Sequence, residues 1–202
     1  MSKLSEILPI YFKKSFIYSA LSGIIEDPPF EFEGFAIGKI IYNEHGKCLC
    51  LEKGQPYRSS KNRKNQTKQK YGAFERIVNT QKLLKEYFND KEDMVATFHS
   101  HGYGDNFTLS DDDKKVIKVD AKIIRKKFDL YYERWPEILM NVKIIRSPIE
   151  KKAKIRRLKN GMYSFKIPYI DEERQFNVYM NGFWVDIENN EDDINAEIIF
   201  IR

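Results

Sequence analysis

Cysteine is scarce in this chain. Cys48 and Cys50 are the only two cysteines among 202 residues. Two residues at this spacing on a strand are poorly placed to bond to each other. We therefore expect both to be small, buried strand residues rather than part of a disulfide framework, which fits a reducing cytoplasm.

Long apolar runs are also missing. No stretch approaches the ~20 apolar residues that a membrane-spanning helix needs. The chain is 32% charged and 42% hydrophobic, with a mean hydropathy of −0.59. These values predict a soluble, cytoplasmic protein with no membrane partner, and 202 residues are enough for one sizeable core.

Positive charge is in modest excess and unevenly placed. The net charge is +5; basic residues gather in 58–70 and 150–159, whereas 186–193 are acidic. Basic clusters can bind nucleic acid or an acidic protein surface, although the commoner meaning is a solvent-exposed loop. Neither stretch interleaves aromatic and basic residues as single-strand binders do, so the sequence gives little support to a nucleic-acid partner.

Apolar periodicity predicts an α/β protein with a mixed sheet flanked by helices. The predicted helices span residues 10–25, 73–88 and 111–131. The predicted strands in the same region span residues 32–42, 47–52 and 93–99. Residues 54–71 are polar, basic and aperiodic, which predicts a flexible loop.

The last third of the chain is rich in β-favouring residues. A strand is predicted over 138–145 and another over 196–201. Asn160-Gly161 and Asn181-Gly182 each lie between β-favouring runs, which predicts two hairpin turns. We therefore divide the chain into a core (1–135) and a β-rich extension (136–202), which either continues the main sheet or forms a small lobe.

Histidine is as scarce as cysteine, and two of the three histidines are His99 and His101. His99 ends the strand predicted over 93–99 and His101 follows two positions later, and side chains two positions apart along an extended chain point to the same face. Two imidazoles are thus placed within reach of one metal ion. The third, His45, lies in a predicted turn, and we do not count it as a ligand.

A carboxylate follows at a short distance. Ser110 is a suitable helix N-cap, and Asp113 lies on the first turn of the helix that it would start. If that turn folds over the end of the strand, a carboxylate joins the two imidazoles. Two histidines and one carboxylate, with the fourth position left to water, are a common protein set for catalytic zinc.

The order His-x-His, a short gap and Ser-x-x-Asp resembles the signature of the JAMM (MPN+ or JAB) zinc metallopeptidases. Upstream, Glu31–Gly38 has the form Glu-x-x-Gly-x-x-x-Gly, which in that family often carries the acid/base glutamate. The resemblance covers roughly residues 10 to 130. It implies a JAMM/MPN-like fold, with a mixed curved sheet between helices.

The resemblance also implies roles for single residues. It assigns Zn²⁺ to His99, His101 and Asp113, general acid/base catalysis to Glu31, and support of the oxyanion to Ser110. Glu33 lies on the same strand face and is the alternative to Glu31. Zinc lowers the pKa of bound water to about 7, the glutamate moves its proton, and Ser110 donates a hydrogen bond to the oxyanion. The expected reaction is hydrolysis of an amide or isopeptide bond.

Departures from the family pattern bear on the substrate. Gly102 stands where the family usually has proline, and His-Ser-His-Gly is closer to JAB-like domains of bacterial Rhs-type proteins than to eukaryotic deubiquitinases. We expect a protein or peptide substrate, of which a ubiquitin-like tail is one form. A toxin or effector peptidase with a narrow peptide target, a catalytically silent MPN-type interaction module and a nucleic-acid-binding module stay open as alternatives.

Overall fold

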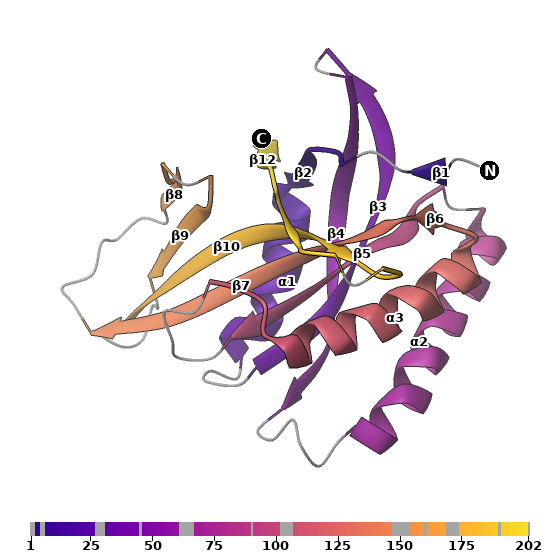
Figure 1. The fold of residues 1–202 in the computed structure, drawn as a ribbon. Helices are drawn as coiled ribbons and strands as arrows, with labels where there is room; N and C mark the ends of the chain where they lie inside the picture. Colours follow the sequence, from indigo (N-terminus) through magenta and orange to yellow (C-terminus); the bar gives the residue numbers. More distant parts are fainter. Residues whose placement is uncertain are drawn as a thin grey trace.

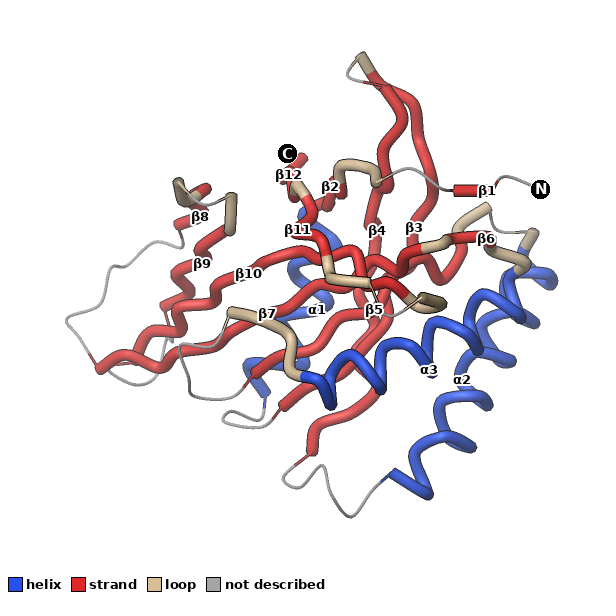
Figure 2. Tube along the Cα trace, in the orientation of Figure 1, coloured by secondary structure: helices blue, strands red, loops and turns tan. Residues whose placement is uncertain are grey.

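The structure, a computed structural model, describes residues 3–4, 7–26, 31–44, 46–60, 67–89, 91–101, 107–146, 154–159, 161–168, 174–189 and 191–201. Within these residues, three helices and twelve strands form a mixed α/β fold (Figure 1; Figure 2). The predicted α/β class is therefore confirmed.

Most strands belong to one curled sheet. Its strands are β2 (Ile10–Lys13), β3 (Glu31–Asn43), β4 (Gly46–Ser60), β5 (Asp93–His101), β7 (Arg134–Arg146), β8 (Lys154–Arg157), β9 (Tyr163–Pro168), β10 (Arg174–Asp186), β11 (Ile194–Ala196) and β12 (Ile198–Ile201). They lie in the order β12-β2-β4-β3-β5-β7-β10-β9-β8, and β11 pairs with β10. Strands from both sides of residue 135 thus share one sheet, while the division into a core and an extension stays a prediction.

The remaining elements are three helices and a small strand pair. The helices are α1 (Lys14–Glu26), α2 (Thr67–Phe88) and α3 (Asp111–Phe128), and β1 (Lys3–Leu4) pairs in parallel with β6 (Tyr131–Tyr132). No helix in the described part of the chain is long and apolar enough to cross a membrane.

The helices cover opposite faces of the sheet, with α1 on one side and α2 and α3 on the other (Figure 1). Phe16 of α1 packs against Phe98 of β5, with ring centroids 5.8 Å apart. Tyr57 of β4 packs against Phe74 of α2 at 5.2 Å. Because adjacent strand residues point to opposite faces, His99 faces the side of α2 and α3.

Local sequence fixes both ends of α3. At its start, the Ser110 hydroxyl accepts a hydrogen bond from the Asp113 backbone N–H, and the Asp113 carboxylate accepts one from the Ser110 N–H. At its end, Asp129 has a φ of 55° and donates its N–H to the Arg125 carbonyl. The helix therefore stops at Phe128, slightly earlier than predicted.

Two predictions in the first half of the chain need correction. Residues 10–13 form β2 instead of the start of a helix, because β2 is an inner strand between β12 and β4 and its apolar side chains are buried. The predicted loop over 54–71 is largely strand and helix, since β4 continues to Ser60 and α2 begins at Thr67. Residues 61–66 and His45 lie outside the described residues.

One predicted hairpin is right and the other is wrong. Gly161, with a φ of +84°, falls between β8 and β9, which pair antiparallel, while Asn160 lies outside the described residues. Asn181-Gly182 instead lies inside the continuous strand β10. A Cβ on residue 182 would lie 2.6 Å from the Ile198 side chain. Glycine is therefore needed here because the last strands of the chain pass close to β10, and not because the chain turns.

Gly182→Val should therefore destabilise the fold by about 1–3 kcal/mol, as overpacking of a filled interior does. The added side chain pushes Ile198 and so weakens the docking of β11 and β12. Urea unfolding measures the change, and adding Ile198→Ala to Gly182→Val should recover part of the loss. Equal stability of Gly182→Val and the wild type would contradict the close approach.

Candidate metal centre

The central strand β5 carries both histidines at its carboxyl end. It lies between β3 and β7, and its register places His99 opposite Glu33 on one side and Leu139 on the other. His99 is 4% exposed, so its ring lies within the layer between the sheet and α3. The N-terminal turn of α3 brings Asp113 to the same place.

The polar atoms of His99, His101 and Asp113 converge. His99 Nε2 lies 3.2 Å from His101 Nε2, and His101 Nε2 lies 3.3 Å from Asp113 Oδ2. His99 Nε2 is 3.8 Å from Asp113 Oδ1. The structure thus brings all three predicted zinc ligands together, with one ligand atom of each within 4.8 Å of the others, while their role as ligands stays a prediction.

These spacings fit a zinc ion. Zinc binds imidazole nitrogen and carboxylate oxygen at about 2.0–2.2 Å, so two ligand atoms at corners of a tetrahedron lie about 3.3–3.6 Å apart. The two imidazole nitrogens, 3.2 Å apart, and His101 Nε2 with Asp113 Oδ2, 3.3 Å apart, are close to that range, whereas His99 Nε2 is nearer to the other carboxylate oxygen, Oδ1, at 3.8 Å. Three ligands also leave the fourth corner open, as catalytic zinc sites do.

Glu137 of β7 fixes the ring of His99. Glu137 Oε1 lies 2.6 Å from His99 Nδ1, and the other carboxylate oxygen accepts a hydrogen bond from the Thr97 hydroxyl. That hydroxyl in turn accepts from Trp135 Nε1–H at 2.8 Å. With its Nδ1–H donated to Glu137, His99 keeps the Nε2 lone pair for a metal.

The surroundings of Glu137 oppose its charge. The side chain is 1% exposed, and burial raises the pKa of its carboxyl, while the hydrogen bond from His99 acts in the opposite direction. Such a carboxylate is tolerable only with strong donors. Glu137 therefore depends on the hydrogen bond from His99 to offset its burial, and the His99 ring depends on the same bond for its orientation.

Ser110 holds Asp113 in place. Its backbone N–H donates to Asp113 Oδ2 at 2.8 Å, and its hydroxyl donates to the same oxygen at 2.6 Å. Asp113 is buried, whereas Asp111 and Asp112 are exposed. Only one of the three aspartates therefore faces the histidines. The hydroxyl predicted to support an oxyanion bonds to Asp113 in this structure.

Both candidate glutamates lie on β3. Glu33 is paired with His99 across the sheet, and its Oε2 accepts a hydrogen bond from the Tyr57 hydroxyl at 3.2 Å. The backbone of Glu31 belongs to the same strand, but its side chain lies outside the part of the chain that the structure describes. The choice between Glu31 and Glu33 therefore stays open.

A small cavity lies beside His99, between the sheet and α3. About 20 Å³ of it is open to the centre of a water molecule, which is room for one water or ion. Four carboxyl groups line it: those of Glu33, Asp113, Asp120 and Glu137. The Tyr57 hydroxyl lies 3.2 Å from both Glu33 and Asp120, and burial, reinforced by these carboxylates, raises its pKa well above the usual value. This excess of carboxylates favours a cation.

Four polar residues of this site are not predicted from the sequence: Tyr57, Thr97, Asp120 and Glu137. Two of them carry a detectable signal. Asp120 falls on the apolar stripe of α3, two turns after Asp113, and Glu137 is the one acidic residue of the largely apolar strand β7. Thr97 is an ordinary strand residue, and Tyr57 was assigned to a loop, so neither could be singled out.

Comparisons with known proteins do not assign a family. No family model matches the chain, and no curated protein matches it. Among solved structures, a protein of Desulfitobacterium hafniense known from its solution structure is similar at 12% identity, with 95% of this chain and 92% of that chain covered. The TM-score is 0.45, a likeness too weak to support an argument.

Glu137→Ala should weaken zinc binding about 10- to 100-fold, the usual cost of losing the partner that orients a ligating histidine. Without the carboxylate, the His99 ring is free to rotate and to change tautomer. Competition with a chromophoric chelator measures the affinity. Glu137→Gln keeps an acceptor for the His99 N–H and should lose less. A folded Glu137→Ala variant with wild-type zinc affinity would show that Glu137 does not orient His99.

Proposed function

We propose that this chain is a zinc-dependent hydrolase of the JAMM/MPN+ type. It cleaves an amide or isopeptide bond and releases a ubiquitin-like protein, or another protein or peptide, from a conjugate. One observation carries the proposal: the side chains of His99, His101 and Asp113, which the motif names as ligands, converge, with one ligand atom of each within 4.8 Å of the others. The mixed sheet between helices is compatible with the fold of that family.

Each part of the site has its own task. His99, His101 and Asp113 hold the ion, and Glu137 keeps the Nε2 atom of His99 directed at it. Bound zinc supplies a Lewis acid and makes water nucleophilic near neutral pH. A glutamate of β3 takes the proton of the attacking water and gives it to the leaving amine.

Ser110 has two hydrogen-bond donors, and we assign a different role to each. Its backbone N–H, 2.8 Å from Asp113 Oδ2, keeps the ligand in place throughout. Its hydroxyl, 2.6 Å from the same oxygen, can turn to a developing oxyanion because the N–H still holds Asp113. Such a donor acts where charge appears in the transition state.

Zinc content tests the metal centre directly. Wild type purified after zinc-replete expression should contain about one zinc per chain, and His101→Ala should lose it. Asp113→Asn should also lose most of its zinc, whereas the matched change Asp112→Asn should cost only ~0.3–1 kcal/mol of stability through the helix dipole. Metal-free wild type, or equal effects at 112 and 113, would refute the centre.

Glutamine substitutions identify the acid/base group. Glu31→Gln and Glu33→Gln should both keep zinc and the fold, and one of them should abolish release of amine from isopeptide-linked and linear peptides. The resemblance favours Glu31, whereas the cavity position favours Glu33. Zinc-loaded protein that hydrolyses none of these peptides, in wild type as in both variants, would favour the catalytically silent interaction module instead.

A further inference from the structure

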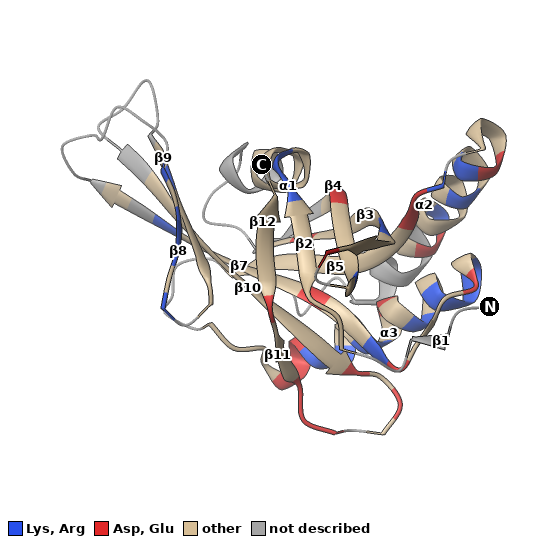
Figure 3. Cartoon of the chain, turned by 90° about the horizontal axis from the view of Figure 1, so that it is seen from above, with Lys and Arg blue, Asp and Glu red and all other residues tan. Residues whose placement is uncertain are grey.

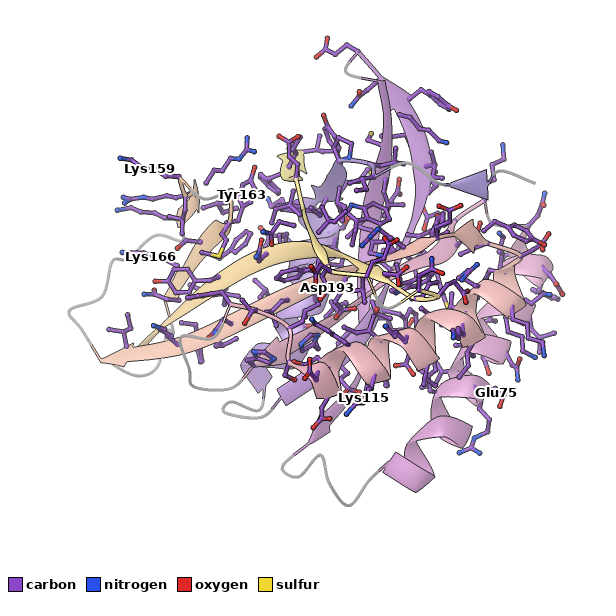
Figure 4. All side chains as sticks on the ribbon, in the orientation of Figure 1. Glu75, Lys115, Lys159, Tyr163, Lys166 and Asp193 are labelled. Carbon is purple, nitrogen blue, oxygen red and sulfur yellow. The ribbon has the colours of Figure 1, made fainter. Side chains whose placement is uncertain are left out.

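The apolar side of α2 changes along the helix. In the first half, the apolar side chains of Phe74 and Val78 are buried, whereas Glu75 points away from the sheet (Figure 4). In the second half the side toward the sheet is partly polar, because Gln81 and Lys85 bind polar side chains of the sheet. A helix that only covered the sheet would keep its apolar residues on one side.

The apolar residues of the second half are exposed instead. Leu83, Leu84, Tyr87 and Phe88 expose 65%, 44%, 82% and 70% of their surface, and we call these four residues the α2 patch. Residues four positions apart are neighbours on a helix, and the Tyr87 and Phe88 rings lie 5.0 Å apart between centroids. Figure 3 shows this end of α2 extending away from the sheet. The α2 patch is thus contiguous and open to a partner.

The α2 patch is larger than scattered exposed residues would make it. With about 200 Å² for each aromatic side chain, Tyr87 and Phe88 alone expose on the order of 300 Å². The two leucines bring the patch to on the order of 500 Å², a size that often marks an interaction site. Two copies that cover each other's patch would bury on the order of 1,000 Å², which is the lower bound for a specific interface.

The outward side of α2 also has the spacing of a seam between two helices. Four exposed residues follow one another at the a and d intervals of a coiled coil: Arg76, Thr80, Leu83 and Tyr87. In an antiparallel pair of α2 helices about a two-fold axis, Thr80 of each copy meets Leu83 of the other. Arg76 then meets the Tyr87 ring, a favourable cation–π contact, and lies close to Glu86 of the other copy. The seam is therefore complementary to itself, as a two-fold interface requires.

We propose that the α2 patch is the interface of a homodimer in which the α2 helices of two copies pack antiparallel. This dimer leaves the candidate metal centre accessible. Lys85 of α2 pairs with Asp93 at the amino end of β5, whereas His101 lies at the other end of that nine-residue strand, about 26 Å away. The proposal is independent of the proposed function, because no part of the interface involves the metal.

The mass of the full chain in solution tests the interface, by analytical ultracentrifugation over a concentration series that spans the micromolar range. Wild type should pass from the 24.0 kDa monomer to twice that mass. Leu83→Glu with Tyr87→Glu should abolish the dimer, because two charges then lie in the seam, while glutamate keeps the helix propensity high. The matched control, Tyr18→Glu, replaces an aromatic residue that is 62% exposed on α1 and should dimerise as wild type does.

An exchange of charges tests the antiparallel register. Arg76→Glu should raise the dissociation constant roughly tenfold, because it places a carboxylate close to Glu86 of the other copy. Adding Glu86→Arg restores opposite charges across the seam and should recover most of the affinity. The recovery cannot arise within one helix, since positions 76 and 86 are about 15 Å apart along its axis.

Each outcome decides one point. Wild type that stays monomeric throughout the series overturns the proposal, whatever other protein the α2 patch binds. A dimer that survives Leu83→Glu with Tyr87→Glu, or that Tyr18→Glu weakens equally, also overturns it. If the double variant does not fold, Tyr87→Glu alone is measured in its place.

The dimer and the metal centre can fail separately. His101→Ala, which lacks a metal ligand, should dimerise as wild type does, and a monomeric His101→Ala would place the contact at the metal centre and overturn the assignment to α2. A charge exchange that recovers no affinity overturns the antiparallel register.

Discussion

The hydrogen bond between His99 Nδ1 and Glu137 Oε1, at 2.6 Å, is the contact on which the rest of the site depends. A charged carboxylate out of water costs several kcal/mol, which only well-placed donors offset, and the donors here are His99 and Thr97. Both lie on β5 at alternate positions, so the carboxylate fits one register of the β5–β7 pair. A slip by one residue would turn Glu137 to the opposite, apolar face.

The same register arranges charge across the sheet. Because Glu137 is fixed beneath His99, Asn141 must lie beside His101 and Lys143 one step further out. Carboxylates therefore gather under the histidines, next to α3, and lysines gather on the outer strands of the same face. A cation is favoured at the first place, where carboxylates surround the histidines.

The convergence of His99, His101 and Asp113 could be predicted from the sequence better than their surroundings, for a physical reason. His99, His101 and Asp113 are encoded locally, since strand alternation and a helix cap fix their directions, and one strand–helix step brings them together. Glu137 comes from a strand much later in the chain, and only the register of a parallel pair reveals its partner. The structure describes the convergence of these three side chains, whereas the side chain of Glu31 is not described; the role of all four residues stays a prediction.

The errors in the fold have the same origin. Residues 10–13 have the apolar spacing of a helix, but burial on both faces between two parallel neighbours overrides that pattern. Asn181-Gly182 has the local form of a turn, yet Gly182 is needed because β11 and Ile198 pass close over β10. In both cases a tertiary contact with the last strands determines the local structure. The residues that are neighbours in the sequence do not contain that information.

Tyr57 shows how closely cation and proton are linked in this cavity. Its hydroxyl is 3.2 Å from a carboxylate of Glu33 and 3.2 Å from one of Asp120, but a hydroxyl has one proton to donate. The second oxygen–oxygen contact is favourable only when another proton or a nearby positive charge is present. A metal ion held by His99, His101 and Asp113 would supply that charge from the adjoining wall. Metal binding at such a site releases protons, and its affinity must fall as the pH is lowered.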